Sequence, residues 1–268
     1  MSEQSRPVTP RPAATVVLVR DVADGVEVFM LQRDPALTFG GGAHVFPGGS
    51  VDRADRSGRL QRLVDDRDDA GASRRLGLES GGLAYWIAAI RECFEEAAVL
   101  LARDAAGVLL GGGTEHDGEL EAARQRLIAG EDEFAAFCED RGLTLAASEL
   151  CYLSHWITPE AVPKRFDTRF FIAGAPPGQE ARACQQETVA HTWIRPEEAI
   201  VRSDGGEIEL MFPTRKTLES LSGYSSAAAL LAEVRARAHV PAIQPRVVKG
   251  SGGIRVLLPG EPGYDDPQ

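Results

Sequence analysis

The stretch that decides the fold is Arg91-Glu92-Cys93-Phe94-Glu95-Glu96-Ala97-Ala98-Val99. A helix turns by about 100° per residue, so residues three and four apart share a face. With Glu92 as the origin, Glu95 lies at roughly −60° and Glu96 at roughly +40°. The apolar positions gather on the opposite side of the same wheel, near about 180°: Ile87, Ile90, Phe94, Ala97 and Leu101. We therefore predict a helix over 83–103 that buries one face and presents three carboxylates on the other.

These carboxylates carry the chemical information in the helix. Like charges one turn apart cost a helix a few tenths of a kcal/mol per pair, and the one cation within the motif is Arg91. Clustered hard oxygen donors suit Mg²⁺ or Mn²⁺. Taken alone, the helix is equally consistent with an acidic face in contact with solvent, so its interpretation depends on the residues upstream.

A glycine pair precedes the helix, in Phe46-Pro47-Gly48-Gly49. Together, the two segments resemble the box of the Nudix hydrolases, which reads G, five residues, E, seven residues, then R-E-apolar-x-E-E-x-G-apolar. Ala98 stands at the second glycine, and counting five residues after Gly49 gives Asp55 in place of the first glutamate. Residues 56–90 separate the halves by 35 positions instead of seven, so an insertion of 28 residues splits the box.

All but one of the inserted positions lie in residues 56–82, the predicted insertion segment, which is rich in Arg, Asp, Gly and Ser. We expect it to leave and rejoin the fold between the glycine loop and the helix, since a long loop costs little extra closure entropy. Its acidic run at 65–69 is typical of a solvated surface. The resemblance implies that Asp55 supports the structure of the box, and that Ala98 weakens only a turn or close-packing preference.

Strand and helix patterns interleave along the rest of the chain. We expect strands at 14–19, 26–31, 150–157, 168–173 and 188–194, and helices within 119–141, from Pro196, and at 213–222 and 225–239. This order predicts an α/β (α+β) protein with a mixed β-sheet sandwiched between α-helices, which is also the Nudix fold.

We expect three regions along the chain: a flexible N-terminal arm at 1–12, a Nudix hydrolase domain at 13–240, and a C-terminal tail at 241–268. The domain would contain the insertion at 56–82 and a second, helical insertion at 104–148.

The resemblance also implies roles for individual residues. Glu92, Glu95 and Glu96 would bind Mg²⁺ or Mn²⁺, and the backbone carbonyl of the glycine pair, at Gly48 or Gly49, would join them. Such cations bridge diphosphate oxygens and lower the pKa of a bound water, whose proton Glu95 or Glu96 would accept. Arg91 completes the candidate catalytic set by orienting a carboxylate of the box rather than by touching the substrate.

Other segments resemble the acyl-coenzyme A diphosphatase branch of the family, namely Leu31-Gln32-Arg33, residues 42–49, 156–160 and 163–171. This resemblance implies hydrolysis of coenzyme A or acyl-CoA to phosphopantetheine, or its acyl form, and adenosine 3′,5′-bisphosphate.

Several cations are candidate contacts for the phosphates of such a substrate, because cationic donors suit anionic oxygens. Arg165 and Arg169 share one face of an expected strand, and Lys164 precedes them. Arg33 and the Gly48 backbone complete the candidate substrate-binding set. Ordinary surface charges on a half-buried strand explain these residues equally well. Glu187 is either an extra metal ligand or a surface acid.

Two other functions remain open on the sequence. One is a Nudix pyrophosphatase that acts on NADH, nucleotide sugars or capped RNA. The other is a non-catalytic, nucleotide-sensing Nudix domain. Such sensors usually carry a DNA-binding segment and degraded box acids, whereas the three acids are intact here and the sequence contains no helix-turn-helix candidate.

Composition limits the partners. The 268 residues carry a formal charge of −11, which disfavours broad nucleic-acid binding and anionic membranes. No apolar run approaches the roughly 20 residues that span a bilayer. Four scattered cysteines without a CxxC pair fit a reduced, cytoplasmic protein. We expect a small-molecule nucleotide substrate, and a homodimer is compatible with the sequence.

Overall fold

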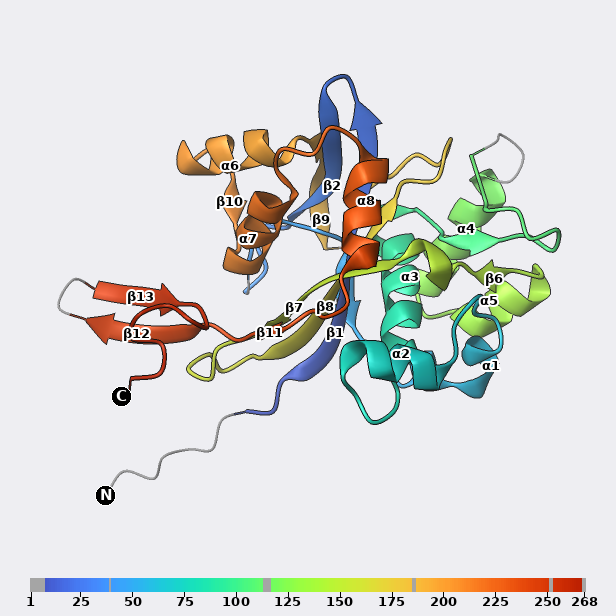
Figure 1. The fold of residues 1–268 in the computed structure, drawn as a ribbon. Coiled ribbons are helices and arrows are strands. Elements are labelled where there is room, and N and C mark those ends of the chain that lie inside the picture. The colour runs from blue at the N-terminus through green and yellow to red at the C-terminus, as the bar shows by residue number, and fades with distance from the viewer. Residues whose placement is uncertain (1–7, 39, 113–116, 185–186, 251–252, 267–268) are drawn as a thin grey trace.

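The computed structural model describes residues 8–38, 40–112, 117–184, 187–250 and 253–266. Helices cover both faces of one mixed sheet (Figure 1), as the sequence predicts. In the described residues its strands follow the order β10 (Glu209–Leu210), β3 (Ala43–Val45), β2 (Gly25–Arg33), β1 (Arg11–Val22), β8 (Phe166–Gly174), β7 (Cys151–Ile157) and β11 (Ala242–Ile243). Two further strands pair off this path: β4 (Gly48–Ser50) with β1, and β9 (Thr188–Ile194) with β2.

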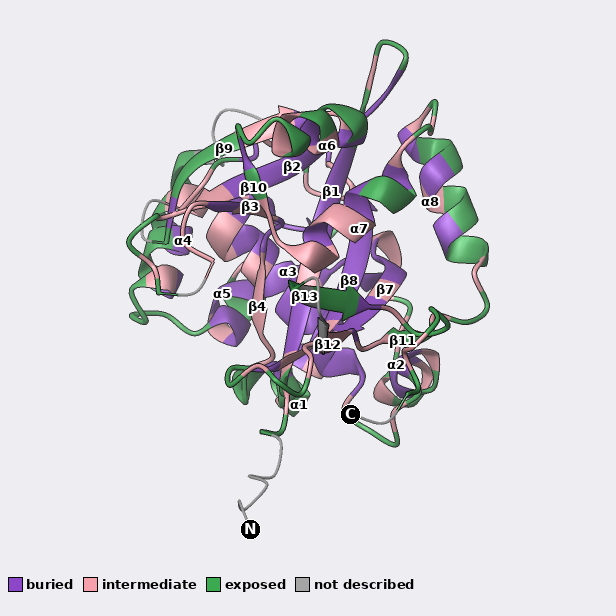
Figure 2. Cartoon of the chain, turned by 90° about the vertical axis from the view of Figure 1, so that its left-hand side faces the viewer, coloured by how far each residue is buried: buried purple, intermediate pink, exposed green. Residues whose placement is uncertain are grey.

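Strand β1 shows why the sheet needs helices on both sides. Val16 and Leu18 point into one hydrophobic core, while Val17 and Val19 point into the other. Successive side chains of a strand face opposite ways, so a strand covered on both faces is apolar throughout rather than alternating. The continuous apolar run at 14–19 is therefore the centre of the molecule, and Figure 2 shows this strand buried along most of its length.

The first core lies between the sheet and α3 (Leu83–Ala97), with its neighbours α1 (Gly58–Gln61), α2 (Asp69–Leu76), α4 (Asp117–Ile128) and α5 (Phe134–Asp140). The second core lies under α6 (Pro196–Asp204), α7 (Phe212–Leu221) and α8 (Ala227–Ala236). Short elements complete the first side: the 3-10 turns η1 (Ala54–Arg56) and η2 (Ala147–Glu149), and the antiparallel pair β5 (Ala102–Arg103) and β6 (Thr144–Leu145). Pro196 begins α6, as the sequence predicts, and Gly142 follows the C-cap Arg141 of α5 with φ of +61°.

The insertion at 56–82 is a folded part of the first core. Leu60 and Ala72 are buried against α3, and the carboxylate of Asp69 accepts the backbone N–H groups of Gly81 at 2.9 Å and Leu83 at 3.0 Å. The first N–H groups of a helix have no partner within the helix, so Asp69 caps α3 from a distant segment. The expectation of a solvated acidic run is therefore wrong for Asp69.

Helix α3 is shorter and more buried than the predicted amphipathic helix over 83–103. It ends at Ala97, because Ala98 adopts the left-handed conformation with φ of 57°. Its sides also contact the insertion helices, so Tyr85 and Cys93, away from the predicted apolar stripe, are buried as well.

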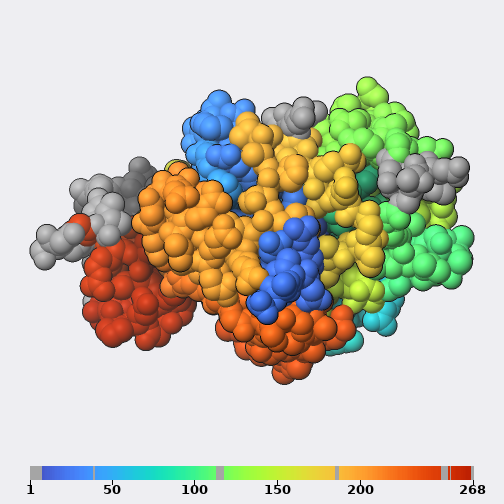
Figure 3. Space-filling view, turned by 90° about the horizontal axis from the view of Figure 1, so that it is seen from above, coloured from blue at the N-terminus to red at the C-terminus, as the bar shows by residue number. Residues whose placement is uncertain are grey.

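Both ends of the chain differ from the predicted boundaries. Residues 1–7 of the predicted arm lie outside the described residues, and residues 11–12 already belong to β1. The predicted tail adds β11 to the edge of the sheet beside β7. It then forms a hairpin of β12 (Arg246–Gly250) and β13 (Gly253–Leu257) that stands out from the body in Figure 1 and lies at one edge of the molecule in the space-filling view of Figure 3. Among the described residues, no helix combines the length and the apolarity needed to cross a membrane.

Ala98→Gly is expected to stabilise the protein. Glycine adopts positive φ without the steric cost of a Cβ, and its extra freedom in the unfolded chain offsets only part of that gain. The free energy of unfolding in urea should rise by about 0.5–1 kcal/mol. The matched control, Ala97→Gly, changes the last residue of the helix, which is fully buried in the core, and should lose about 1 kcal/mol. Equal losses in both variants would contradict this explanation.

Candidate active site

The glycine pair belongs to β4, which pairs with the first half of β1, whereas β2 pairs with the second half of β1 along the same edge. Residues 19–22 of β1 pair with β2, whereas residues 13–15 pair with β4, so that Ala14 is opposite Gly49 and Thr15 is opposite Gly48. Between the two pairings, the N–H of Val16 donates to the carbonyl of Pro47 at 2.8 Å. The backbone of 47–49 is therefore fixed by the central strand of the sheet, next to α3.

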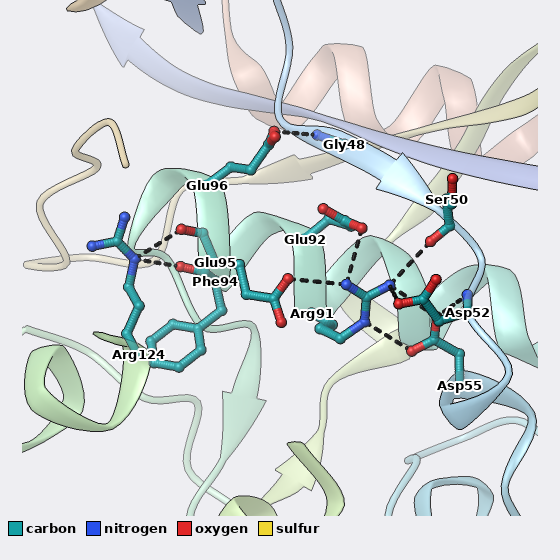
Figure 4. Close-up of polar contacts among 10 residues, drawn as sticks. All are labelled: Gly48, Ser50, Asp52, Asp55, Arg91, Glu92, Phe94, Glu95, Glu96 and Arg124. Atoms are coloured by element: carbon teal, nitrogen blue, oxygen red, sulfur yellow. Dashed lines mark hydrogen bonds and ion pairs between the residues drawn. The ribbon is translucent and has the colours of Figure 1, made fainter. Parts of the chain in front are cut away.

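The two halves of the box meet at this point, as the split-box interpretation requires. The Gly48 N–H donates to Oε2 of Glu96 at 2.8 Å (Figure 4). A Cβ on Gly49 would lie 2.4 Å from Oε1 of Glu92, so a side chain there would displace that carboxylate. At Gly48 a Cβ would meet the backbone of Ala14 and Thr15, so glycine is required there by the close approach of loop and strand.

Asp55 and Arg91 form the bond that joins loop and helix. The Arg91 guanidinium donates to both carboxylate oxygens of Asp55, at 2.9 and 3.0 Å, in the bidentate geometry that makes such pairs strong. Asp55 is fully buried and also accepts the N–H of Asp52 at 2.7 Å. Asp55, at the position of the first glutamate of the box, therefore has the structural role that the resemblance implies.

Arg91 also holds two of the acids on its own helix. Its Nη1 donates to Glu92 and to Glu95, each at 2.9 Å, and its Nη2 donates to the carbonyl of Ser50 at 3.0 Å (Figure 4). With 9% of its side chain exposed, Arg91 has little access to a substrate. Its contacts are to the loop and to the neighbouring acids, and the role of orienting a box carboxylate stays a prediction.

The carboxylates around Arg91 carry more negative charge than this one guanidinium can neutralise. Burial raises the pKa of Glu92 to about 7, although the charge of Arg91 opposes the rise. Burial and then the Glu92 carboxylate raise the pKa of Glu96 to about 8, and burial also raises the pKa of Glu95. Burial disfavours the charge of Arg91, but its bonds to Asp55 and the nearby glutamates raise its pKa overall. The site therefore favours binding of protons or further cations.

The chemistry of this donor set fits a hard divalent cation, since several carboxylate oxygens and backbone carbonyls lie together. Glu92 and Glu95 keep 13% and 21% of their side chains exposed, so both are accessible. They point toward Arg91 while Glu96 contacts Gly48, and the described His, Cys, Asp and Glu residues include no group of three already arranged around one point.

A cavity of about 1210 Å³ opens over the acids. The glycine pair, Arg91 and the three glutamates of α3 form part of its wall. Its volume lies above the range of roughly 300–1,000 Å³ usual for small-molecule sites, so it has room for an extended ligand.

Three of the other predicted polar residues line this cavity: Arg33, Lys164 and Glu187. Arg33 Nη2 lies 3.9 Å from the carboxylate of Glu187, and Arg33 Nε is buried without a hydrogen-bond partner in the described part of the chain. The charge of Arg33 acts on Glu96, so it lies close to the acids. Glu187 keeps 64% of its side chain exposed at the rim.

Arg165 and Arg169 do not line the cavity, contrary to their predicted role as phosphate contacts. Arg165 is buried and donates to the backbone carbonyls of Thr158 at 3.0 Å and Val8 at 2.8 Å. Arg169 is buried on the other face of the sheet, where it pairs with Asp167 and His155. Their guanidinium groups are engaged within the protein.

The alternation of faces predicted along β8 is correct. However, the cavity meets the face opposite to the one that carries Arg165 and Arg169. Phe166, Thr168 and Phe170 line it, whereas Arg169 lies 5.3 Å from the ring of Tyr85 on α3. The sequence shows which residues share a face, whereas the face that meets the cavity depends on the packing of α3 and α7.

The sequence interpretation missed one residue that fixes the acidic helix. Arg124 on α4 is buried, and its Nε donates to the carbonyls of Phe94 at 2.9 Å and Glu95 at 3.0 Å near the end of α3 (Figure 4). The sequence could have indicated that Arg124 is buried, because it follows Leu120 by four residues and precedes Leu127 by three, on the apolar face of the helix. An arginine there needs internal acceptors.

Asp55→Asn tests the bond between loop and helix. The change leaves the buried Arg91 without its main counter-charge, which in buried pairs costs about 3–5 kcal/mol. Asp52→Asn is the matched control, because Asp52 lies 3.7 Å from the same guanidinium but has 61% of its side chain exposed. It should cost less than about 1 kcal/mol in urea unfolding. Similar losses for the two variants would show that burial does not set the strength of this bond.

Glu96→Gln is expected to change how stability depends on pH in the presence of a chelator. The raised pKa of Glu96 means that the folded state holds more protons than the unfolded state from about pH 5 to about 8, so its contribution to stability falls as pH rises. The variant should have a flatter profile and a higher melting temperature than wild type at pH 8. Glu198→Gln, at an exposed position on α6, should keep the wild-type slope. An unchanged slope in Glu96→Gln would refute the assignment.

Comparison with known proteins gives the chain its family. The family model that describes the NUDT19 Nudix domain matches residues 78–218. The chain is 29% identical to acyl-coenzyme A diphosphatase NUDT19 from Homo sapiens, across 97% of this chain and 77% of the relative, and 30% identical to the protein of that name from Gallus gallus, across 90% and 74%.

A solved structure agrees with these relatives. The crystal structure of a Nudix hydrolase from Alicyclobacillus acidocaldarius superposes with a TM-score of 0.70 at 28% identity, and covers 84% of this chain and 96% of that one. With a family match that extends over more than half of its length, the chain belongs to the Nudix hydrolases, in the NUDT19 branch, and is a hydrolase of diphosphate bonds.

Proposed function

We propose that the protein hydrolyses the diphosphate of coenzyme A or acyl-CoA, with phosphopantetheine, or its acyl form, and adenosine 3′,5′-bisphosphate as products. The observation that carries this proposal is the cavity of about 1210 Å³, which extends to both sides of the acids of α3. Coenzyme A has its diphosphate in the middle and a large group at either end, so it needs room on both sides of the reacting bond. The names of the human and chicken relatives support the same substrate class.

Mg²⁺ or Mn²⁺ is the proposed cofactor, held by Glu92, Glu95 and Glu96 with the backbone carbonyl of Gly49. Bound there, it would neutralise the diphosphate charge and lower the pKa of the attacking water. The surplus of carboxylates over cations, with the pKa of Glu96 raised to about 8, supports this assignment, because a divalent ion would compensate the buried negative charge.

The chain itself supplies position and proton transfer. Arg91 Nη1 donates to Glu92 and to Glu95, each at 2.9 Å, so one nitrogen holds both carboxylates in place. Either Glu95 or Glu96 accepts the proton of the attacking water. Arg33 lines the cavity beside Glu96 and Glu187, so its guanidinium would meet an oxygen of the diphosphate.

A substrate panel tests this proposal. Coenzyme A, a long-chain acyl-CoA, NADH, ADP-ribose and a capped RNA fragment are each incubated with Mg²⁺ or Mn²⁺, and the product masses are read. We expect the coenzyme A compounds to be cleaved at the diphosphate with the highest kcat/KM, and activity to vanish in chelator.

Glu95→Gln and Glu96→Gln should each lower kcat by at least about 100-fold, since each change removes a charged ligand or the proton acceptor. Glu198→Gln, outside the cavity, should retain wild-type kcat. No turnover of coenzyme A compounds alongside cleavage of NADH or ADP-ribose would reject the substrate, and full activity in both Glu95→Gln and Glu96→Gln would reject the site.

A further inference from the structure

The cavity has two walls of different chemistry on either side of β4. One is formed by β7, β8 and the start of α7, and the other by α1, α4 and α5. Figure 2 shows α5 on one side of β4 and α7 and β7 on the other, and Figure 1 shows α7 and β7 on one side of α3 and α1 and α5 on the other. The acids of α3 contact β4 through Gly48 and Gly49, so they lie between the two walls.

The first wall, called here the aromatic wall, consists of Trp156, Phe166, Phe170 and Phe212 with Lys164. The rings of Trp156 and Phe212 meet edge to face at 6.1 Å, and Lys164 Nζ lies 5.4 Å from the ring centroid of Phe166. Aromatic faces of this kind stack on nucleobases, at about 1–3 kcal/mol per base.

An unsatisfied donor supports the same conclusion. Trp156 is 6% exposed, and its indole Nε1–H has no hydrogen-bond partner among the described residues. A buried donor without an acceptor costs about 1–3 kcal/mol, so a rotation of the ring that brings this N–H to a ligand acceptor would recover that cost. The ring nitrogens of a purine are such acceptors. Arg33 borders this wall. A Cβ on Gly40 would lie 3.8 Å from Arg33 Cδ and 3.4 Å from Met211 Sδ, and Met211 directly precedes Phe212.

The second wall, called here the insertion wall, comes from the two segments inserted into the fold. Its apolar members are Leu60, Leu127, Ile128, Phe134 and Ala135. Its charged members are Arg59, Asp132 and Glu133. Arg59 is paired with Glu133 at 3.1 Å and with Glu139 at 2.6 Å. This wall is therefore aliphatic, with no surplus of positive charge.

We infer that substrate lies across β4 in one direction, with its 3′-phosphoadenosine half on the aromatic wall and its pantetheine and acyl half on the insertion wall. The inference rests on the proposed function and adds an orientation to it. The 3′-phosphate is a dianion at neutral pH, and it meets Lys164 on the aromatic wall. On the insertion wall it meets Asp132 and Glu133, with Arg59 already paired to Glu133 and Glu139. The pantetheine arm is uncharged and the acyl chain is apolar, so they match the insertion wall.

Lys164→Gln tests the aromatic wall with a pair of substrates that differ by one phosphate. For coenzyme A, kcat/KM should fall about tenfold, which corresponds to about 1.4 kcal/mol of lost binding. For 3′-dephospho-coenzyme A it should change less than about twofold, because the group that Lys164 contacts is missing. Trp156→Phe keeps an aromatic ring but removes the N–H and part of the stacking area, so it should weaken the binding of both substrates to the same degree.

Arg59→Gln is the matched control, since it removes one cation from the opposite wall of the same cavity. It should leave the ratio of coenzyme A to 3′-dephospho-coenzyme A activity within about twofold of wild type. Phe134→Ala on the insertion wall should lower kcat/KM for lauroyl-CoA several-fold relative to free coenzyme A. Product inhibition gives a second readout: Lys164→Gln should raise the inhibition constant of adenosine 3′,5′-bisphosphate and leave that of phosphopantetheine unchanged.

The reverse pattern would overturn the orientation. If Arg59→Gln alters the phosphate preference while Lys164→Gln alters the acyl preference, or if neither changes its ratio, the orientation is wrong although the proposed function stands. If wild type cleaves neither coenzyme A compound while it cleaves another diphosphate, the proposed function and the orientation are both rejected.

Discussion

The site depends on one buried cation. Arg91 binds Asp55 with two hydrogen bonds, the carbonyl of Ser50 with a third, and the carboxylates of Glu92 and Glu95 with its remaining nitrogen. A guanidinium has donors in a fixed planar fork and keeps its charge when buried, so it can hold a loop and a helix in one relative position. Without it, the acids of α3 and the glycine loop would have no common partner. The same contacts leave the negative charge only partly compensated, and that imbalance is what suits the site to cations.

The acidic helix and the glycine pair could be predicted because their information is local. A spacing of three and four residues places the carboxylates on one side of any helix, and the resemblance to a known box brings Gly48, Gly49 and Asp55 to them despite the insertion. The sandwich of helices around a mixed sheet followed from the interleaved patterns. What could not be predicted depends on long-range packing. The cavity face of β8 is set by which helices cover each side of the sheet, so the alternation around Arg169 was right and its assignment to the substrate was not.

Composition misled the interpretation of the insertion for a physical reason. A segment rich in Arg, Asp, Gly and Ser is usually solvated, since it has too few apolar side chains to form a core of its own. Residues 56–82 do not need one, because Leu60 and Ala72 complete a core that α3 already provides. The same holds at the C-terminus, where two residues of β11 extend the sheet and a short hairpin follows. Segments that pack onto an existing surface need few apolar residues of their own, so their sequence gives little indication that they are folded.

The cap that Asp69 places on α3 has a consequence for how this enzyme can diverge. An ordinary surface loop can lengthen, shorten or be exchanged between lineages, because few other parts of the fold contact it. Here one segment both anchors the first turn of the acid-bearing helix and, through Leu60, faces the ligand space. Grafting a foreign loop into this position would disturb the reaction centre together with the binding surface. New substrate preferences in this lineage are therefore more accessible through single exchanges at the cavity wall than through wholesale loop replacement.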